Sequence, residues 1–244
     1  MSETVGTEKE EARKRVAAEH AAQWIEDGMV IGLGTGSTVR HLLDYIAERR
    51  AEGEWKRIVG IPSSRETELR ARSLNIPLGS LDKYPSPDLM IDGADEVDND
   101  LRLIKGLGGA LLREKIVAEA SKLLVIVVDD TKLVDRLGSR VPLPVEVDCF
   151  GAATHLPFFR SIGAEPELRR GGDGEPFLSD GGHLIYDCHF RGGISEPEAL
   201  ERTLLDRPGI LETGLFLGMA DDVVAAGGAG TRVITRYHSR ESDR

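Results

Sequence analysis

Residues that cross-link or anchor proteins are scarce in this sequence. Only two cysteines occur among its 244 residues, Cys149 and Cys188, and neither lies in a CxxC motif or a Cys/His metal-ligand spacing. Because a chain of this length buries a sufficient core without cross-links, its stability need not come from disulfides or a structural metal. We expect a reducing, cytoplasmic location.

Long apolar runs are also missing. No run approaches the roughly 18 residues of a membrane helix, and the first 15 residues have neither the basic nor the apolar region of a signal peptide. We therefore expect no membrane partner and no export by that route.

Positive charge is limited too. The chain has 31 Lys and Arg against 42 Asp and Glu, a net charge of −11 and a pI of about 5.1. Nucleic-acid binding needs clustered basic residues, so no nucleic-acid partner is expected. Only eight of the basic residues are lysine, which makes a lysine inside a glycine-rich motif a candidate for a specific role. Any anionic substrate must be bound by local donors that work against the overall charge.

What the first 141 residues do contain is an alternation of strand and helix patterns. Apolar runs occupy 29–32, 57–61, 88–91 and 123–129, and helical stretches occupy 37–50, 64–73 and 109–122. The motif Thr7-Glu8-Lys9-Glu10 matches a capping box and predicts that a first helix begins there. The alternation predicts an α/β fold with a Rossmann-like, mostly parallel sheet flanked by helices.

The pattern changes where Pro142 and Pro144 interrupt it. Residues 142–207 show a β-α-β-β-α order, which is typical of a small ferredoxin-like α+β domain. Within it, the motif Ser195-Glu196-Pro197-Glu198 predicts a second capped helix. Short apolar strands at 215–217, 223–226 and 232–235 are expected to rejoin the first sheet. The predicted domains are 1–141 with 208–244, and 142–207.

The first motif suited to binding a ligand is the turn Gly32-Leu33-Gly34-Thr35-Gly36-Ser37-Thr38. Its glycines fit neither the dinucleotide fingerprint nor a P-loop. The turn still brings amides and hydroxyls to a helix N-terminus, as a cradle for phosphate or carboxylate does. The alternative is a tight turn in which Ser37 only caps the helix. The candidate anion-binding residues are Thr35, Gly36, Ser37 and Thr38.

The second motif is Asp92-Gly93-Ala94-Asp95-Glu96-Val97-Asp98, which follows an apolar run. Ligands of open α/β sheets bind at the carboxyl ends of the strands, so Asp92 and Asp95 are candidates to face one pocket. Crowding of carboxylates raises the pKa of at least one of them. A solvated acidic loop and a divalent-metal site remain alternatives.

The third motif runs from Lys105 through a glycine loop into a helix that carries Glu114. The residues three and four positions from Glu114 are all apolar, so its side chain is expected on the buried face. Burial raises a carboxyl pKa toward the range of a general base, and Lys105 supplies a charge for an oxyanion. The alternative is a structural ion pair of Glu114 with Arg113 or a nearby lysine.

In this order and spacing, the three motifs resemble those of ribose-5-phosphate isomerase of the A type. The segments 129–132 and 142–147 support the resemblance, which extends from about residue 10 to residue 234. It implies interconversion of ribose 5-phosphate and ribulose 5-phosphate through an enediol, in the pentose phosphate pathway, without a cofactor or a metal. It also implies a sugar-phosphate substrate and a homodimer or homotetramer.

The resemblance assigns roles residue by residue. Glu114 matches the base, and Asp92, Asp95 and Lys105 match positions that handle hydroxyl protons and the oxyanion. Lys14 matches a basic residue near the phosphate. The substrate-binding positions are Thr35, Gly36, Ser37, Thr38, Asp92, Gly93, Ala94, Asp95, Lys105, Gly106, Leu107, Gly108 and Lys132.

One residue departs from the family pattern. Leu107 stands where many relatives have glycine, and a leucine at positive φ would be strained.

Two other classes of protein share the α/β scaffold. A CoA-transferase would use a glutamate as nucleophile, and a sugar-phosphate sensor would carry a DNA-binding domain. No GxSxG elbow is present, so serine hydrolase chemistry has no support.

Overall fold

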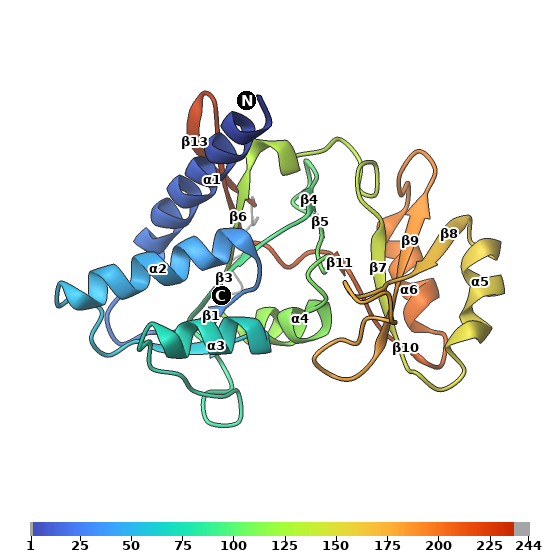
Figure 1. Ribbon diagram of the computed structural model, residues 1–244, viewed down its shortest axis with the longest axis horizontal. Coiled ribbons are helices and arrows are strands. Elements are labelled where there is room, and N and C mark those ends of the chain that lie inside the picture. The colour runs from blue at the N-terminus through green and yellow to red at the C-terminus, as the bar shows by residue number, and fades with distance from the viewer. Residues whose placement is uncertain (1, 237–244) are drawn as a thin grey trace, which may run out of the picture.

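The computed structural model describes residues 2–236, and their side chains from residue 9 onward. Its main sheet has six strands in the order β13-β12-β6-β3-β1-β2 (Figure 1). All neighbours in this sheet run parallel except β12 and β13. The strands are β1 (Val30–Leu33), β2 (Val59–Pro62), β3 (Leu89–Gly93), β6 (Leu124–Asp129), β12 (Asp222–Gly227) and β13 (Gly230–Thr235).

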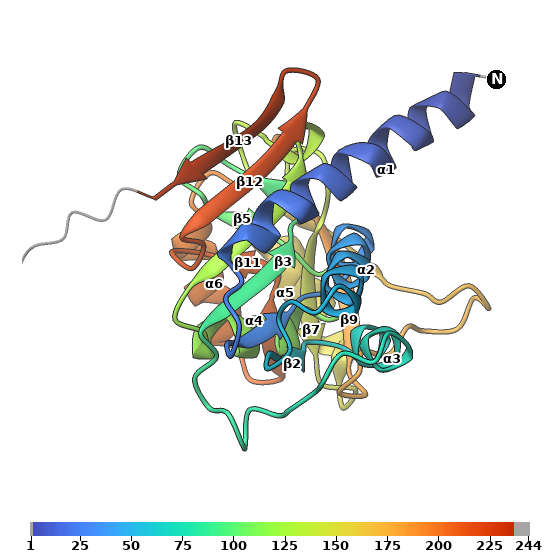
Figure 2. The ribbon, with the colours of Figure 1, turned by 90° about the vertical axis from the view of Figure 1, so that its left-hand side faces the viewer.

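Helices cover both faces of this sheet, which explains its apolar strands. In β6, Val125 and Val127 face one core, and Ile126 and Val128 face the other. Helices α1 and α2 pack on the first face, and α4 packs on the second. Figure 2 shows α1 lying across the sheet beside α2. The helices are α1 (Ser2–Ala21), followed by the 3-10 turn η1 (Ala22–Trp24), then α2 (Ser37–Ala51), α3 (Arg65–Ser73) and α4 (Leu111–Ala120).

A second, antiparallel sheet has the order β10-β7-β9-β8 and its own core. Its elements follow one another as β-α-β-β-α-β, so the predicted ferredoxin-like topology is confirmed. The chain order is β7 (Leu143–Val147), η3 (Ala152–Thr154), α5 (His155–Ser161), β8 (Ala164–Leu168), β9 (Leu184–Phe190), α6 (Pro197–Leu205) and β10 (Ile210–Thr213).

The last strand of this sheet was not predicted. Thr213 of β10 pairs with Val145 of β7, so the second sheet extends past residue 207. Of the three strands expected to rejoin the main sheet, β12 and β13 do so. The third, β11 (Leu215–Phe216), instead pairs with β5 (Leu103–Ile104), which in turn pairs with β4 (Glu96–Val97). The domain division at residues 142 and 208 stays a prediction, and residues 237–244 lie outside the described residues.

Both predicted capping boxes are wrong. Helix α1 already begins at Ser2, so Thr7 lies inside it, and Glu10 pairs with Lys14 at 2.6 Å. Helix α6 begins at Pro197, whose fixed φ suits the first helical position. Its cap residue is therefore Glu196, which makes no side-chain capping bond.

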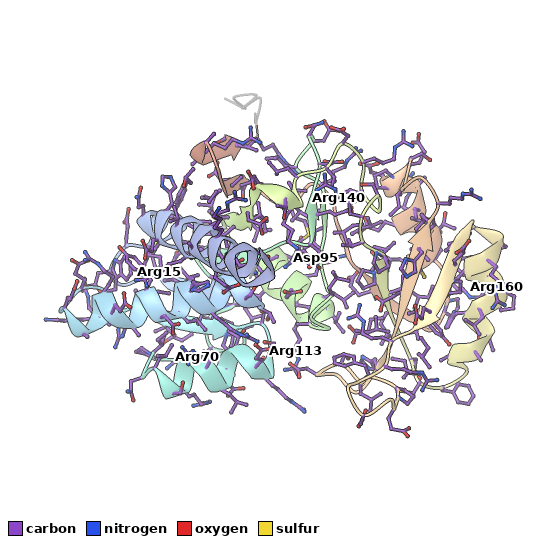
Figure 3. All side chains as sticks on the ribbon, turned by 45° about the horizontal axis from the view of Figure 1, so that its top comes forward. Arg15, Arg70, Asp95, Arg113, Arg140 and Arg160 are labelled. Atoms are coloured by element: carbon purple, nitrogen blue, oxygen red, sulfur yellow. The ribbon has the colours of Figure 1, made fainter. Side chains whose placement is uncertain are left out.

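Charged side chains such as Arg15, Arg70 and Arg160 cover the outer surface, whereas Asp95 lies between the two halves of the molecule (Figure 3). Across residues 2–236, no helix has the length and apolar character that crossing a membrane requires.

Candidate active site

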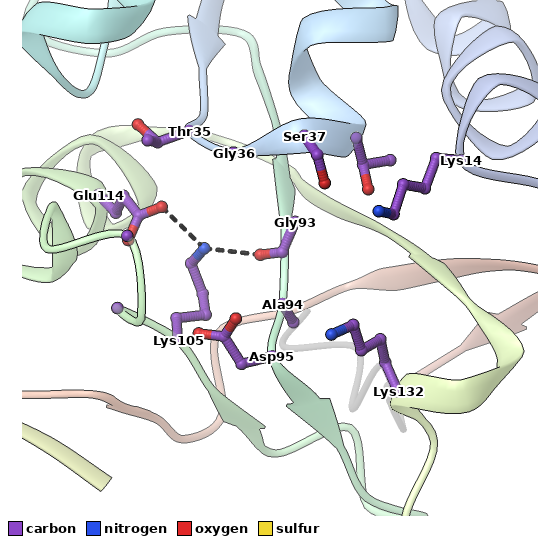
Figure 4. Close-up of a pocket in the computed structure, with 13 residues that line it drawn as sticks. Lys14, Thr35, Gly36, Ser37, Gly93, Ala94, Asp95, Lys105, Glu114 and Lys132 are labelled. Atoms are coloured by element: carbon purple, nitrogen blue, oxygen red, sulfur yellow. Dashed lines mark hydrogen bonds and ion pairs between the residues drawn. The ribbon is translucent and has the colours of Figure 1, made fainter. Parts of the chain in front are cut away.

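The three sequence motifs meet in one pocket at the carboxyl ends of β1, β3 and β6, where open parallel sheets bind ligands (Figure 4). Two predicted site residues, Asp92 and Leu107, do not line this pocket. The lining residues are Lys14, Thr35, Gly36, Ser37, Thr38, Gly93, Ala94, Asp95, Lys105, Gly106, Gly108, Glu114 and Lys132.

The glycine turn after β1 follows from a close approach between strands. A Cβ at Gly34 would lie 2.1 Å from Oδ1 of Asp92, so only glycine fits there. The cap residue of α2 is Gly36, and Ser37 makes no capping bond, so the capping alternative for Ser37 is wrong. Within the described residues, the hydroxyls of Ser37 and Thr38 have no hydrogen-bond partner and border the pocket at the helix N-terminus. This arrangement suits an anion.

Thr35 contributes to the site through its backbone. Its amide donates to Oδ1 of Asp92 at 3.0 Å. Its hydroxyl lies 2.9 Å from the hydroxyls of both Ser63 and Ser64, at the start of α3. The Thr35 hydroxyl therefore braces the turn against α3 and does not point to a ligand.

A buried ammonium connects the second and third motifs. Nζ of Lys105 lies 2.9 Å from Oδ2 of Asp92 and 3.1 Å from Oε1 of Glu114, and it donates to the carbonyl of Gly93 at 2.6 Å. Asp92 is fully buried behind this ammonium, and Glu114 is 4% exposed, which confirms the predicted burial. Oε2 of Glu114 has no hydrogen-bond partner in the described part of the chain. Glu114 thus lines the pocket and keeps one buried carboxylate oxygen without a partner among the described residues.

Burial and charge set the protonation of this cluster. Burial, together with the negative charge of Asp92, raises the pKa of Glu114 to about 8, although Lys105 opposes the shift. Burial alone would lower the pKa of Lys105, but Asp92 and Glu114 outweigh it and raise that pKa above its usual value. The cluster therefore combines a permanent cation with a carboxyl group that titrates near neutral pH.

The acidic motif divides into a part that lies at the pocket and a part that holds backbone amides. Asp95 lines the pocket and accepts the Leu107 amide at 3.0 Å, and burial raises its pKa. Glu96 accepts the amides of Gly138 and Arg140 at 2.5 and 2.7 Å. Asp98 is likewise used structurally, to accept the backbone amides of its own turn. The solvated-loop alternative is therefore wrong for Asp92, Glu96 and Asp98, which are buried.

The leucine in the glycine loop is not strained. Positive φ angles fall on Gly106 at 103° and Gly109 at 81°, whereas Leu107 is absent from the residues with positive φ. Its side chain points outward and is 37% exposed. The loop therefore accommodates leucine at position 107 without a left-handed backbone.

Two further lysines border the pocket at the end away from Glu114 (Figure 4). Lys132 follows β6 in the turn η2 (Asp130–Lys132), and no described carboxylate pairs with it. Lys14 is 8% exposed and pairs with Glu10 and Glu11 on its own helix. Only the packing of α1 against the sheet brings Lys14 here, and no local sequence signal indicates that.

No three His, Cys, Asp or Glu side chains of the described residues are grouped to hold a metal ion. The space between Asp92 and Glu114 contains the Lys105 ammonium. The site thus has a free carboxylate oxygen, a fixed cation beside it and an anion cradle at its other end. These features define an α/β protein whose site is equipped for proton transfer on an anionic substrate.

Comparisons with known proteins agree with this class. The family model of ribose 5-phosphate isomerase A (phosphoriboisomerase A) matches residues 59–230. Ribose-5-phosphate isomerase A of Roseiflexus castenholzii is 52% identical over 217 residues, which cover 89% of this chain and 92% of the relative. The same enzyme of Gloeobacter violaceus is 51% identical over 223 residues, 91% of this chain and 95% of the relative.

Solved structures are also similar. Ribose 5-phosphate isomerase from Plasmodium falciparum has a TM-score of 0.90 at 35% identity, with 93% of this chain and 100% of that chain covered. A D-ribose-5-phosphate isomerase in complex with phospho-erythronic acid has a TM-score of 0.90 at 38% identity, with 93% and 99% covered. The chain therefore belongs to the ribose 5-phosphate isomerase A family of aldose-ketose isomerases.

Proposed function

We propose that this chain interconverts ribose 5-phosphate and ribulose 5-phosphate through an enediolate, in the pentose phosphate pathway. The observation that carries the mechanism is the free Oε2 of buried Glu114 beside the Lys105 ammonium. Conversion of an aldose into a ketose moves one proton from C2 to C1 and a second proton from the O2 hydroxyl to O1. A single base with one free oxygen can serve both carbons in turn.

In the forward direction, Glu114 removes the C2 proton of the open-chain aldose. The electron pair of the C–H bond forms the C1–C2 double bond, and the carbonyl electrons move to O1. Lys105, whose charge is fixed by its two carboxylate partners, stabilises this oxyanion. Glu114 then returns the proton to C1 as the C2 carbonyl forms.

The hydroxyl protons need a second group, and Asp95 is the other carboxylate that lines the pocket beside Glu114. Because burial raises its pKa, Asp95 can hold or release a proton closer to neutral pH than an exposed aspartate. Asp92 has a different role in this proposal. It does not reach the pocket, and it holds the Lys105 ammonium from behind.

The phosphate would bind at the opposite end of the pocket. There Figure 4 shows Ser37, Lys14 and Lys132 around one space. Thr38 and the N-terminus of α2 border the same space, so hydroxyls, ammonium groups and a helix N-terminus meet there. The sugar would lie between the two ends, where the pocket is lined by Gly93, Ala94, Gly106 and Gly108. A phosphorylated pentose therefore has its reactive end at Glu114. The oligomeric state and the cytoplasmic location stay predictions.

The decisive experiment is an assay of the purified chain with ribose 5-phosphate deuterated at C2, with EDTA present. We expect ribulose 5-phosphate to form and part of the deuterium to exchange into water, because the proton on Glu114 borders an open pocket. Absence of turnover would overturn the proposed substrate. Complete transfer of the label to C1 would contradict the open-site enediolate, and activity that returns only with a divalent ion would restore the metal alternative for the Asp cluster.

A further inference from the structure

The loop of residues 105–109, which we call the catalytic loop, receives contacts from a residue that directly follows a strand of the second sheet. Arg169 lies directly after β8, and its Nη1 donates to the carbonyls of Gly106 at 2.8 Å and Leu107 at 3.1 Å. These two residues follow Lys105 directly, and Arg169 is distant from them in sequence. The contact therefore crosses from the antiparallel sheet to the loop beside the pocket.

A carboxylate holds the Arg169 guanidinium in place. Nε of Arg169 donates to Oδ2 of Asp187 at 2.8 Å, and Nη2 pairs with Oδ1 of the same residue. The Arg169 side chain is 11% exposed and that of Asp187 is 17% exposed. A paired fork of this kind fixes both the position and the plane of a guanidinium, which a lysine cannot reproduce.

The two carbonyl contacts orient the amides on the other side of each peptide. In a trans peptide the C=O and N–H groups point in opposite directions, and the described chain has no cis bond. With the Gly106 carbonyl on Arg169, the Leu107 amide points to Oδ2 of Asp95 at 3.0 Å. With the Leu107 carbonyl on Arg169, the amide of Gly108, which lines the pocket, points away from Arg169, and no described protein group accepts it.

The segment 169–183, between β8 and β9, holds the far end of the loop as well. Phe177 packs so closely on Gly109 that a Cβ there would lie 2.4 Å from the phenyl Cζ. The backbone carbonyl of Asp180 accepts from Arg113 of α4 at 3.2 Å. Figure 1 shows this segment reaching from the second sheet toward α4. The segment 169–183 therefore contacts both ends of the loop between Lys105 and α4.

We propose that Arg169, held by Asp187, is a positioning residue that sets the peptide planes of Gly106 and Leu107, and so aims the Gly108 amide and the Asp95 carboxylate at the reacting end of the sugar. The inference rests on the proposed roles of Asp95 and the loop. Arg169 is not among the residues that line the pocket, and other elements form the phosphate end. Loss of the Arg169 side chain should therefore lower kcat by a larger factor than it raises KM.

The test compares Arg169→Met with Arg170→Met. Arg170 is the matched control because it is adjacent, exposed and bonded only to the Gly174 carbonyl of its own turn. We expect Arg169→Met to lower kcat about 10- to 100-fold, with KM changed less than about 3-fold. Arg169→Lys, which can still contact one carbonyl, should recover part of kcat. Arg170→Met should match the wild type.

Two further measurements separate positioning from loss of folding. Hydrogen exchange should increase in the 105–109 segment of Arg169→Met, while the strands of both sheets keep their protection. Asp187→Asn keeps the arginine and weakens its orientation, so an intermediate kcat is expected even if Arg169→Met does not fold. A kcat equal to that of Arg170→Met, or unchanged exchange at 105–109, would overturn the inference. An inactive wild type would instead overturn the proposed function.

Discussion

Two buried glutamates, one in each half of the molecule, have almost the same local description. Glu114 on α4 is 4% exposed and Glu146 on β7 is 1% exposed, and each has one carboxylate oxygen without a partner in the described residues. Their surroundings differ. Glu114 lines a pocket beside the Lys105 ammonium, whereas Glu146 contacts Ser179 at 2.6 Å and His183 at 2.9 Å.

The difference shows that a buried carboxylate with a free oxygen is not by itself a catalytic base. The contacts of Glu146 tie the segment 169–183 to the second sheet, so its role is structural. Glu114 differs because it lines the pocket and lies beside the Lys105 ammonium, the arrangement that the proposed proton transfer requires.

The largest effect is expected for Lys105→Met. Removing the ammonium leaves the buried carboxylates of Asp92 and Glu114 facing each other and removes the oxyanion partner. We expect activity to fall at least about 1000-fold and the free energy of unfolding to fall by about 3 kcal/mol, as measured by the isomerase assay and urea unfolding. The control is Lys122→Met, since the exposed pair of Lys122 with Asp88 contributes at most about 1 kcal/mol. Equal effects of the two variants would contradict the prediction.

The second comparison sets Glu114→Gln against Glu146→Gln. Both replacements are isosteric and remove one ionisable carboxyl. Glu114→Gln should lower kcat about 100- to 10,000-fold, because the amide cannot accept the C2 proton. Glu146→Gln should leave kcat within about 3-fold and lower only the melting temperature. Near-normal turnover by Glu114→Gln would remove the proposed base.

The third prediction concerns pH and has opposite signs for activity and stability. Because the ionised base is required, kcat/KM should rise with pH and reach half its maximum near pH 8, the pKa of Glu114. Between about pH 5 and 8 the unfolded chain loses this proton and the native chain keeps it. Native stability should therefore fall with rising pH. Glu114→Gln should lack this decline, and parallel melting curves for both proteins across the range would refute it.

The smallest effects are expected at the phosphate end. Lys132→Met should raise KM for ribose 5-phosphate about 10-fold with little change in kcat, since it removes an unpaired cation. Lys14→Met should raise KM less, because Glu10 and Glu11 already offset the Lys14 charge. Inhibition by inorganic phosphate should weaken in the same order. The reverse order would show that Lys14 is the principal phosphate ligand.

Much of the fold and part of the candidate site follow from local sequence patterns. The buried strand β6 is a continuous apolar run, and the burial of Glu114 follows from the apolar residues one helical turn away. Steric limits act locally too, so a glycine turn before a helix predicts a tight βα connection. These features depend on neighbours a few residues apart.

Other features depend on contacts between distant segments. The acidic motif does not reveal that Asp95 faces the pocket while Glu96 caps a distant turn, because the difference arises from where residues 138–141 pass. Likewise, the Thr35 hydroxyl is bound by α3, and β10 pairs with β7.

Local patterns in the sequence therefore predict most strands and helices of the main sheet, the three motifs and the residue types of the site, because strand and helix periodicity is local. Three contacts became visible only in the folded chain: Asp92 lies beside the Lys105 ammonium, Lys14 reaches the pocket, and Arg169 contacts the loop that follows Lys105. Each of these contacts joins segments that lie on different elements. Their distances are set by how the sheets and helices pack, and packing is a property of the whole chain.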